Sequence, residues 1–293
     1  MNMNKTVWAL IIALLIGFEA NAQRTGFKPR VFIGPSLGAM NYIGDLDDDF
    51  YPKFTKLGGG GEIRVQFNSH ISARAFAAFG RIGATDAKNT DKVRKARNLS
   101  FRSNIFEFSG HLMYDFFAST RKYRYRPMYN PFVFAGVGVF TFNPKAKYQG
   151  KWYALQPLGT EGQNIPGSKI KPYSLTQICI PFGAGLRVKI KPNIDLNFEL
   201  GFRYLFTDYL DDVSTKEAAD PYLIKQYAGA NGDIAFALAN RANEGSPDQL
   251  TSEEYQWFTT GQQRGDPSDR DWYSYTGVTL SYYLDWVRCP KFK

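Results

Sequence analysis

The sequence predicts an all-β fold: an eight-stranded antiparallel transmembrane β-barrel with long extracellular loops. Three observations lead to this class: a long stretch of strict two-residue alternation, an even number of strand-like segments, and connections that alternate between short and long. A period of two places successive side chains on opposite faces of a strand. Transmembrane barrel strands alternate in this way because one face meets lipid and the other faces a polar lumen.

The clearest strand lies at 193–207. Its even positions, from Ile194 to Phe206, are all apolar. Its odd positions include Asp195, Asn197, Glu199 and Arg203. A row of successive apolar residues on one face suits contact with hydrocarbon. The segment is also much longer than the ~5–6 residues that are usual in globular proteins.

Seven further segments have strand character. The full set is 31–40, 59–67, 70–81, 104–117, 131–142, 178–190, 193–207 and 273–284. The connections after strands two, four and six are the shorter ones (68–69, 118–130 and 191–192), and the others are long (41–58, 82–103, 143–177 and 208–272). Short periplasmic turns and long extracellular loops are the rule for outer-membrane barrels. An even strand count therefore places both termini in the periplasm.

An eight-stranded barrel has a lumen that side chains can fill. The inward-facing charged residues are Glu62, Arg64, Glu107, Arg187, Glu199 and Arg203. We expect them to pair with one another and to close the lumen, so that no wide pore forms. Pro35 and Pro181 each remove a ladder donor, and a bulge is expected near both.

The N-terminal residues predict export. Lys5 precedes an apolar stretch at 7–16, and Ala20-Asn21-Ala22 fits a cleavage site. Residues 1–22 are therefore interpreted as a signal peptide, and 23–293 as the outer-membrane barrel. The stretch 7–16 is too short to span a membrane, and no apolar stretch elsewhere reaches the 18 residues of a candidate transmembrane helix. These features together predict location in the bacterial outer membrane.

Charge is unevenly distributed along a chain whose net charge is +9. The predicted periplasmic segments hold eleven basic residues against the single acidic Asp285, a net charge of +10, whereas the extracellular loop 208–272 has five basic and thirteen acidic residues, a net charge of −8. The candidate partner-binding residues are Arg121, Lys122, Arg124 and Arg126 in one turn, and Arg288, Lys291 and Phe292 in the C-terminal extension 285–293. A basic periplasmic face would attract either anionic lipid head groups or an acidic periplasmic partner, and both alternatives stay open.

No catalytic or metal-binding motif emerges, so neither an enzyme nor a cofactor is predicted. His111 shares a strand face with Ser109 and Asp115, but structural hydrogen bonds suit these lumen residues better than a nucleophilic triad. The acidic run that begins at Asp45 lacks the glycine and glutamate of a calcium-binding EF-hand loop, which favours a solvated acidic turn. Cys179 and Cys289 fall at opposite ends of the predicted barrel, so no disulfide is expected.

Motifs at both ends of the chain resemble one known family. Residues 38–46 contain Tyr42 followed by Gly44, Asp45 and Leu46, as in a G-x-x-x-Y-x-G-D-L signature after the first strand. Residues 264–267, 271–273 and 277–282 resemble the family's last strand, and the tail that contains Cys289 and Pro290 resembles its basic extension. The chain is thus similar to the PorG-like outer-membrane barrels of Bacteroidetes.

The resemblance implies a role in protein secretion. Members of that family include a component of the type IX secretion system, which also serves gliding motility in some species. Its implied partners are outer-membrane lipid and a periplasmic ring of PorK-like and PorN-like proteins. The main alternative is an OmpA- or OmpX-like barrel that acts as an adhesin or binding module through its extracellular loops. The length of loop 208–272 favours this alternative.

Overall fold

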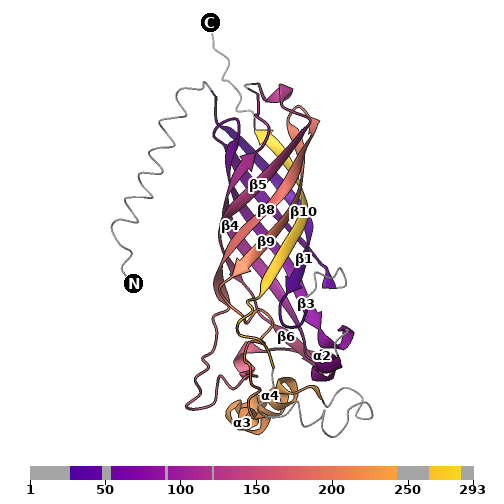
Figure 1. The fold of residues 1–293 in the computed structure, drawn as a ribbon, viewed down its shortest axis with the longest axis vertical. Helices are drawn as coiled ribbons and strands as arrows, with labels where there is room; N and C mark the ends of the chain where they lie inside the picture. The colour runs from indigo at the N-terminus through magenta and orange to yellow at the C-terminus, as the bar shows by residue number, and fades with distance from the viewer. Residues whose placement is uncertain (1–26, 48–53, 90–91, 121, 243–263, 285–293) are drawn as a thin grey trace, which may run out of the picture.

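Eight long strands close into a single antiparallel barrel (Figure 1) in the computed structural model, which describes residues 27–47, 54–89, 92–120, 122–242 and 264–284. The strands are β1 (Arg30–Ile43), β2 (Lys56–Gln66), β3 (Ile71–Thr85), β4 (Ser100–Asp115), β5 (Tyr129–Thr141), β8 (Thr176–Lys191), β9 (Ile194–Leu205) and β10 (Trp272–Leu284). Each pairs with its neighbours in the order β3–β2–β1–β10–β9–β8–β5–β4, and pairing of β3 with β4 closes the barrel. The predicted fold class is confirmed.

The connections define two ends of the molecule. The connections 67–70, 116–128 and 192–193 lie at what we call the short-turn end, and the connections 44–55, 86–99, 142–175 and 206–271 lie at the opposite, long-loop end. The predicted strict alternation of connection lengths is corrected, because the connection 44–55 at the long-loop end has 12 residues and the connection 116–128 at the short-turn end has 13. The predicted signal peptide and the C-terminal extension 285–293 lie outside the described residues.

Strand pairing continues through both prolines without a shift in register. The pairs Ile33–Tyr282 and Ser36–Thr279 on either side of Pro35 belong to one register. Pro181 likewise lies within an unshifted pairing with β9. The bulges expected at these prolines are wrong, because a missing N–H interrupts one hydrogen bond without inserting a residue. The irregularity in β8 lies instead between Lys189 and Lys191, beside the short turn to β9.

The barrel wall is apolar outside and polar inside. Outward side chains stay exposed, for example Leu57 at 81%, Leu37 at 70% and Val137 at 67%. Inward residues such as Glu107 and Arg203 are fully buried. This distribution is the reverse of that in a water-soluble protein and is the pattern of a transmembrane barrel.

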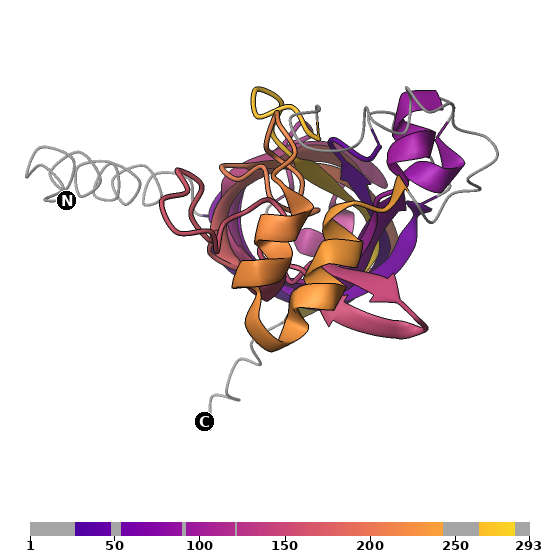
Figure 2. The same ribbon diagram turned by 90° about the horizontal axis from the view of Figure 1, so that it is seen from below.

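The long-loop end carries additional structure. A hairpin of β6 (Lys145–Tyr148) and β7 (Lys151–Ala154) joins the edge of β4 through an Arg102–Lys145 pair. Viewed from this end, α3 (Pro221–Tyr227) and α4 (Gly232–Ala239) lie across the barrel mouth, and the hairpin projects beyond the ring (Figure 2). Loop 143–177 thus contains a hairpin that was not predicted. Among the described residues, no helix is long and apolar enough to cross a membrane.

Candidate functional sites at the lumen and the two ends

Arg74 on β3 organises the middle of the lumen. Its guanidinium lies 2.5 Å from the carboxylate of Glu199 on β9 and 3.4 Å from that of Glu62 on β2. It also donates to Nδ1 of His111, at 3.0 Å from Nε. Phe134 packs against the guanidinium, 4.8 Å from its central carbon. One arginine thereby links four strands across the barrel interior.

Three further ion pairs complete this network. Arg203 donates to Glu107 at 3.0 Å, and Arg187 donates to both oxygens of Asp115 at 2.8 Å. Arg64 lies 3.9 Å from Glu62 and stacks on the Phe32 ring at 3.8 Å. The network joins Arg64, Arg74, Arg187 and Arg203 to Glu62, Glu107, Glu199 and Asp115, four positive charges to four negative ones. The predicted pairing of inward charges is confirmed, and Arg74 is a member of the network that was not predicted.

The three residues considered for a nucleophilic triad are used separately. The Ser109 hydroxyl donates to Glu107 at 2.7 Å, and Asp115 accepts from Arg187. His111 accepts from Arg74 and stacks on Phe134, with 5.1 Å between ring centroids. A nucleophile, a base and an orienting carboxylate in one hydrogen-bonded chain are therefore not assembled by these residues.

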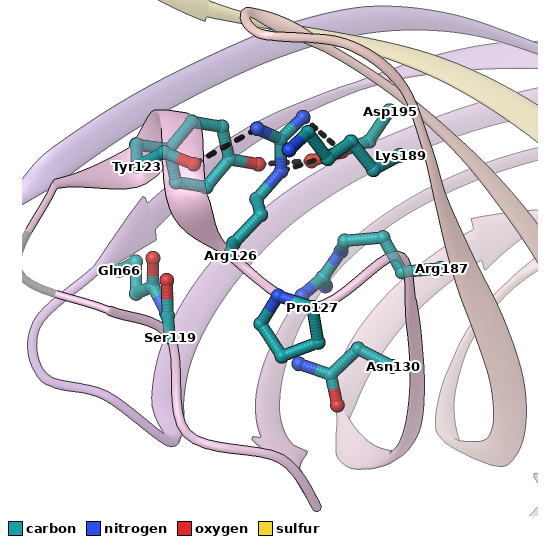
Figure 3. Close-up of a pocket in the computed structure, with 9 residues that line it drawn as sticks. All are labelled: Gln66, Ser119, Tyr123, Arg126, Pro127, Asn130, Arg187, Lys189 and Asp195. Atoms are coloured by element: carbon teal, nitrogen blue, oxygen red, sulfur yellow. Dashed lines mark hydrogen bonds and ion pairs between the residues drawn. The ribbon is translucent and has the colours of Figure 1, made fainter.

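A second plug closes the short-turn end of the lumen (Figure 3). The Arg126 guanidinium lies 2.5 Å from Asp195, as Figure 3 shows. It also donates to the carbonyl oxygens of Pro192 and Lys191 at 2.7 and 2.9 Å. The Tyr123 hydroxyl donates to the same carboxylate, and the Tyr123 ring lies 3.8 Å from the guanidinium carbon of Arg126. The space between these residues is about 10 Å³, which is room for one water at most.

The basic turn at this end is divided between interior and surface. Lys122 and Arg124 are exposed, as predicted for partner-binding residues. Arg126 is 7% exposed, and its charge is matched by Asp195, so the expectation that it forms part of an exposed basic surface is corrected. The 3-10 turn η3 (Tyr123–Tyr125) directs Tyr123 and Arg126 inward and leaves Arg124 outside. Arg121, Arg288, Lys291 and Phe292 lie outside the described residues.

Large side chains surround the two exposed cations. Tyr125 is 66% exposed, Met128 59% and Tyr129 52%. Tyrosine, arginine and methionine are enriched in protein–protein interfaces. The short-turn end thus presents a mixed basic and aromatic surface, which we call the η3 surface and define as Lys122, Arg124, Tyr125, Met128 and Tyr129.

The motif residues after β1 hold the opposite end together. Tyr42 is buried, and its hydroxyl donates to Asp211 and lies 2.9 Å from Asp271. Gly44 leaves room for this contact, since a Cβ there would approach an Asp271 oxygen to 2.0 Å. Leu46 is 1% exposed and packs in the hydrophobic core at the long-loop end. We call the described parts of loops 143–177 and 208–272 at this end the cap. Tyr42, Gly44 and Leu46 therefore connect the first strand to the segments on either side of the large loop.

Asp45 joins the two segments that carry the family resemblance. Its carboxylate accepts from the backbone N–H of Asp266 at 3.1 Å, and its carbonyl accepts from Arg97 at 3.0 Å. Burial raises the pKa of Asp45 to about 7. Asp47 is 6% exposed. These two residues form a packed turn rather than the solvated one expected from the sequence.

A buried acidic and basic cluster lies deeper in the cap. Arg264 lies 3.2 Å from Glu161, which also accepts from the backbone N–H of Ser214 at 2.9 Å. Asp212 accepts from Tyr173 at 2.6 Å, and burial raises the Asp212 pKa to about 7. No group of three or more metal-ligating side chains occurs within the described part of the chain. These contacts bind loops 143–177 and 208–272 together.

The sequence matches the family described as "Domain of unknown function (DUF6089)" over residues 5–239, and the chain belongs to that family. No curated protein matches it in sequence. Among solved structures, the chain is similar to Neisserial surface protein A, with 7% sequence identity and a TM-score of 0.41, and the match covers 87% of this chain and 97% of that chain. It is also similar to a major outer membrane protein of Thermus thermophilus (12% identity, TM-score 0.39), and the match covers 87% of this chain and 99% of that chain. A third similar structure is OprG of Pseudomonas aeruginosa (9% identity, TM-score 0.37), where the match covers 88% of this chain and 98% of that chain.

Proposed function

We propose that this protein is a non-conducting barrel of the bacterial outer membrane that anchors a protein assembly. The buried network of four arginines and four carboxylates across the lumen carries this proposal. Because each of these four arginines is paired with a carboxylate within the barrel, we expect no continuous aqueous path through the interior. The apolar outer wall then serves to hold the protein in lipid.

The finer part of the proposal concerns the partner. We assign the η3 surface to the periplasm and to a ring of PorK-like and PorN-like proteins of the type IX secretion system, with a role in gliding motility where the system drives it. The sequence resemblance supports this partner. The exposure of Lys122, Arg124 and Tyr125 supports the surface. The C-terminal extension 285–293 would add further basic residues on the same side.

Charge reversal of Lys122 and Arg124 tests the docking surface. The variant K122E/R124E leaves the buried Arg126–Asp195 pair intact, so insertion of the barrel should not change. Co-purification of the ring proteins and secretion of a type IX substrate should both fall. The matched control K169E/K171E reverses two exposed lysines at the long-loop end and should retain both. Wild-type co-purification and secretion in K122E/R124E would contradict the proposal.

A second candidate function is binding through the long-loop end. Helix α3 presents Tyr222 at 71%, Tyr227 at 42% and Leu223 at 40% exposure, an apolar surface on an ordered cap. An adhesin or binding module would use such a surface. Replacement of Tyr222 and Leu223 by serine should then reduce adhesion while secretion is unchanged. Loss of secretion with normal adhesion would exclude this candidate.

A further inference from the structure

At the long-loop end, the outward rows of the eight barrel strands contain only two charged residues. The strand pairings identify these rows, since directly opposed residues point to the same side of a sheet. Even positions face outward on β4, β8, β9 and β10, and odd positions on β1, β2, β3 and β5. All eight strands are described, and every outward residue is uncharged except Arg81 on β3 and Arg102 on β4 at the long-loop end, and Lys191, which opposes the outward Ile194 after the irregularity in β8 at the short-turn end. The two arginines are also neighbours, because Arg81 opposes Asn104 and Gly83 opposes Arg102.

Both arginines lie at the edge of the apolar band. Arg81 lies ten residue positions along β3 from Ile71 at the other end of the strand. A tilted strand of that length spans about 25 Å along the membrane normal. This is the height expected of the apolar band of a barrel. Phe79 and Phe106 form a directly opposed outward pair immediately inside Arg81. The positive charges thus begin where hydrocarbon ends.

The β6–β7 hairpin extends this charged surface outside the barrel. Ala146 is buried, so its neighbours Lys145 and Lys147 point to the other, outward face. Lys145 opposes Arg102, and Lys147 opposes Trp152. The guanidinium carbon of Arg102 lies 3.5 Å from the centroid of the Trp152 ring. The hairpin therefore places two lysines and a tryptophan beside the two arginines.

This positive charge is not neutralised within the protein. Arg81 donates to the neutral side chain of Asn104 at 3.0 Å. No ion pair joins Arg81, Arg102, Lys145 or Lys147 to a carboxylate within the described part of the chain. By contrast, Arg64, Arg74, Arg187 and Arg203 in the lumen are each paired with a carboxylate. Elsewhere the same rim carries aromatic residues such as Tyr204 and Trp272 on its outward face.

We propose that Arg81, Arg102, Lys145, Lys147 and Trp152, here called the β3–β4–β6 surface, bind the phosphate of an anionic membrane lipid, in preference to the phosphate of a zwitterionic one. Guanidinium groups bind phosphate oxygens through paired, charge-assisted hydrogen bonds. Tryptophan favours the boundary between head groups and hydrocarbon. The acyl chains of the same lipid would lie along Phe79 and Phe106. The site depends on membrane insertion but not on the docking role of the η3 surface.

Lipid enrichment in nanodiscs tests this proposal. The full chain is inserted in phosphatidylcholine nanodiscs doped with lipid A or with dephosphorylated lipid A, and bound lipid is counted by native mass spectrometry after release into detergent. Wild-type protein should retain lipid A and not the dephosphorylated form. The variant R81Q/R102Q should weaken retention by at least about tenfold, since each basic residue near a membrane surface contributes about 1 kcal/mol of attraction. Folding is verified by the shift between heated and unheated protein on SDS gels.

Two controls, the variant R270Q and competition by inorganic pyrophosphate, distinguish lipid binding at this surface from a general effect of rim arginines and from binding of a soluble anion. Arg270 is exposed at the same end and lies 5.7 Å from the Tyr204 ring, so R270Q removes a rim arginine away from the proposed site and should keep wild-type retention. Equal retention of the phosphorylated and dephosphorylated lipids overturns the proposal. So does unchanged retention in R81Q/R102Q. Full displacement of lipid A by millimolar inorganic pyrophosphate would show that the surface takes a soluble anion and would likewise overturn the assignment to lipid.

Discussion

Replacement of Arg74 by methionine should destabilise the barrel strongly. Arg74 is the only hydrogen-bond donor to Glu199 among the described residues, and both side chains are buried. Glu62 keeps the hydroxyl of Ser281 at 2.5 Å, so the change leaves one buried carboxylate without a donor. Removing one partner of a buried pair typically costs about 3–5 kcal/mol. The free energy of unfolding of R74M should therefore fall by that amount.

The double variant R74M/E199L separates the orphaned charge from a mere loss of packing. Replacing both members of a buried ion pair by apolar residues is often neutral, so the double variant should recover to within roughly 1 kcal/mol of the wild type. His111 loses the same donor in both variants, so this contribution cancels when the two variants are compared with each other, although not when either is compared with the wild type. Urea titration of the protein refolded in lipid vesicles measures all three free energies. A loss below about 1 kcal/mol in R74M, or a double variant no more stable than R74M, would refute the reasoning.

Three further outcomes are expected. Phe198→Arg in the middle of β9 should cost about 2–4 kcal/mol, whereas Tyr204→Arg at the rim should cost about 0–1 kcal/mol; equal costs in bilayer refolding would contradict the assigned lipid depth. Gly44→Ala should loosen the cap and speed trypsin cleavage of the large loop, because the new Cβ displaces Asp271; unchanged cleavage would show the cap to be tolerant. Burial raises the pKa of Asp45 and Asp212 from the usual 3.8 to about 7, so the folded cap binds protons more tightly than the unfolded chain and loses stability as pH rises from about 4 through 7. Hydrogen exchange of residues 208–242, corrected for intrinsic rates, should therefore be slower at pH 5 than at pH 8. Slower exchange at pH 8 would disprove this prediction.

Strand alternation predicted the barrel because lipid and lumen impose opposite polarity on successive residues. The same logic missed Arg74, whose strand has small alanines at 73, 75 and 77 on its outward face and therefore little contrast between the faces. It also missed the β6–β7 hairpin, which is only four residues long on each side. A signal was present there: Gln149 and Gly150 both adopt positive φ, as a tight hairpin turn requires, and Gly after a polar residue favours that turn.

The sites depended on contacts that sequence spacing does not encode. Four basic residues in a short turn suggested one exposed surface, but the turn geometry sends Arg126 to Asp195, which is 69 residues away. Tyr42 was named for its place in a motif, yet its partners Asp211 and Asp271 are 169 and 229 residues distant. Only closure of the barrel brings these segments to one end. Arg81 and Arg102 likewise form one surface only in the folded protein, because the β3–β4 pairing makes them neighbours.

The central claim, a barrel closed by its own charges, is tested most directly by planar-bilayer recording. Purified wild-type protein inserted in a bilayer at roughly physiological salt should show no steady conductance, because Arg74, Arg203 and Arg126 are held by carboxylates at successive levels of the lumen. Insertion is verified independently by protection of the barrel from protease. A steady, large conductance from protein shown to be inserted and folded would contradict the account.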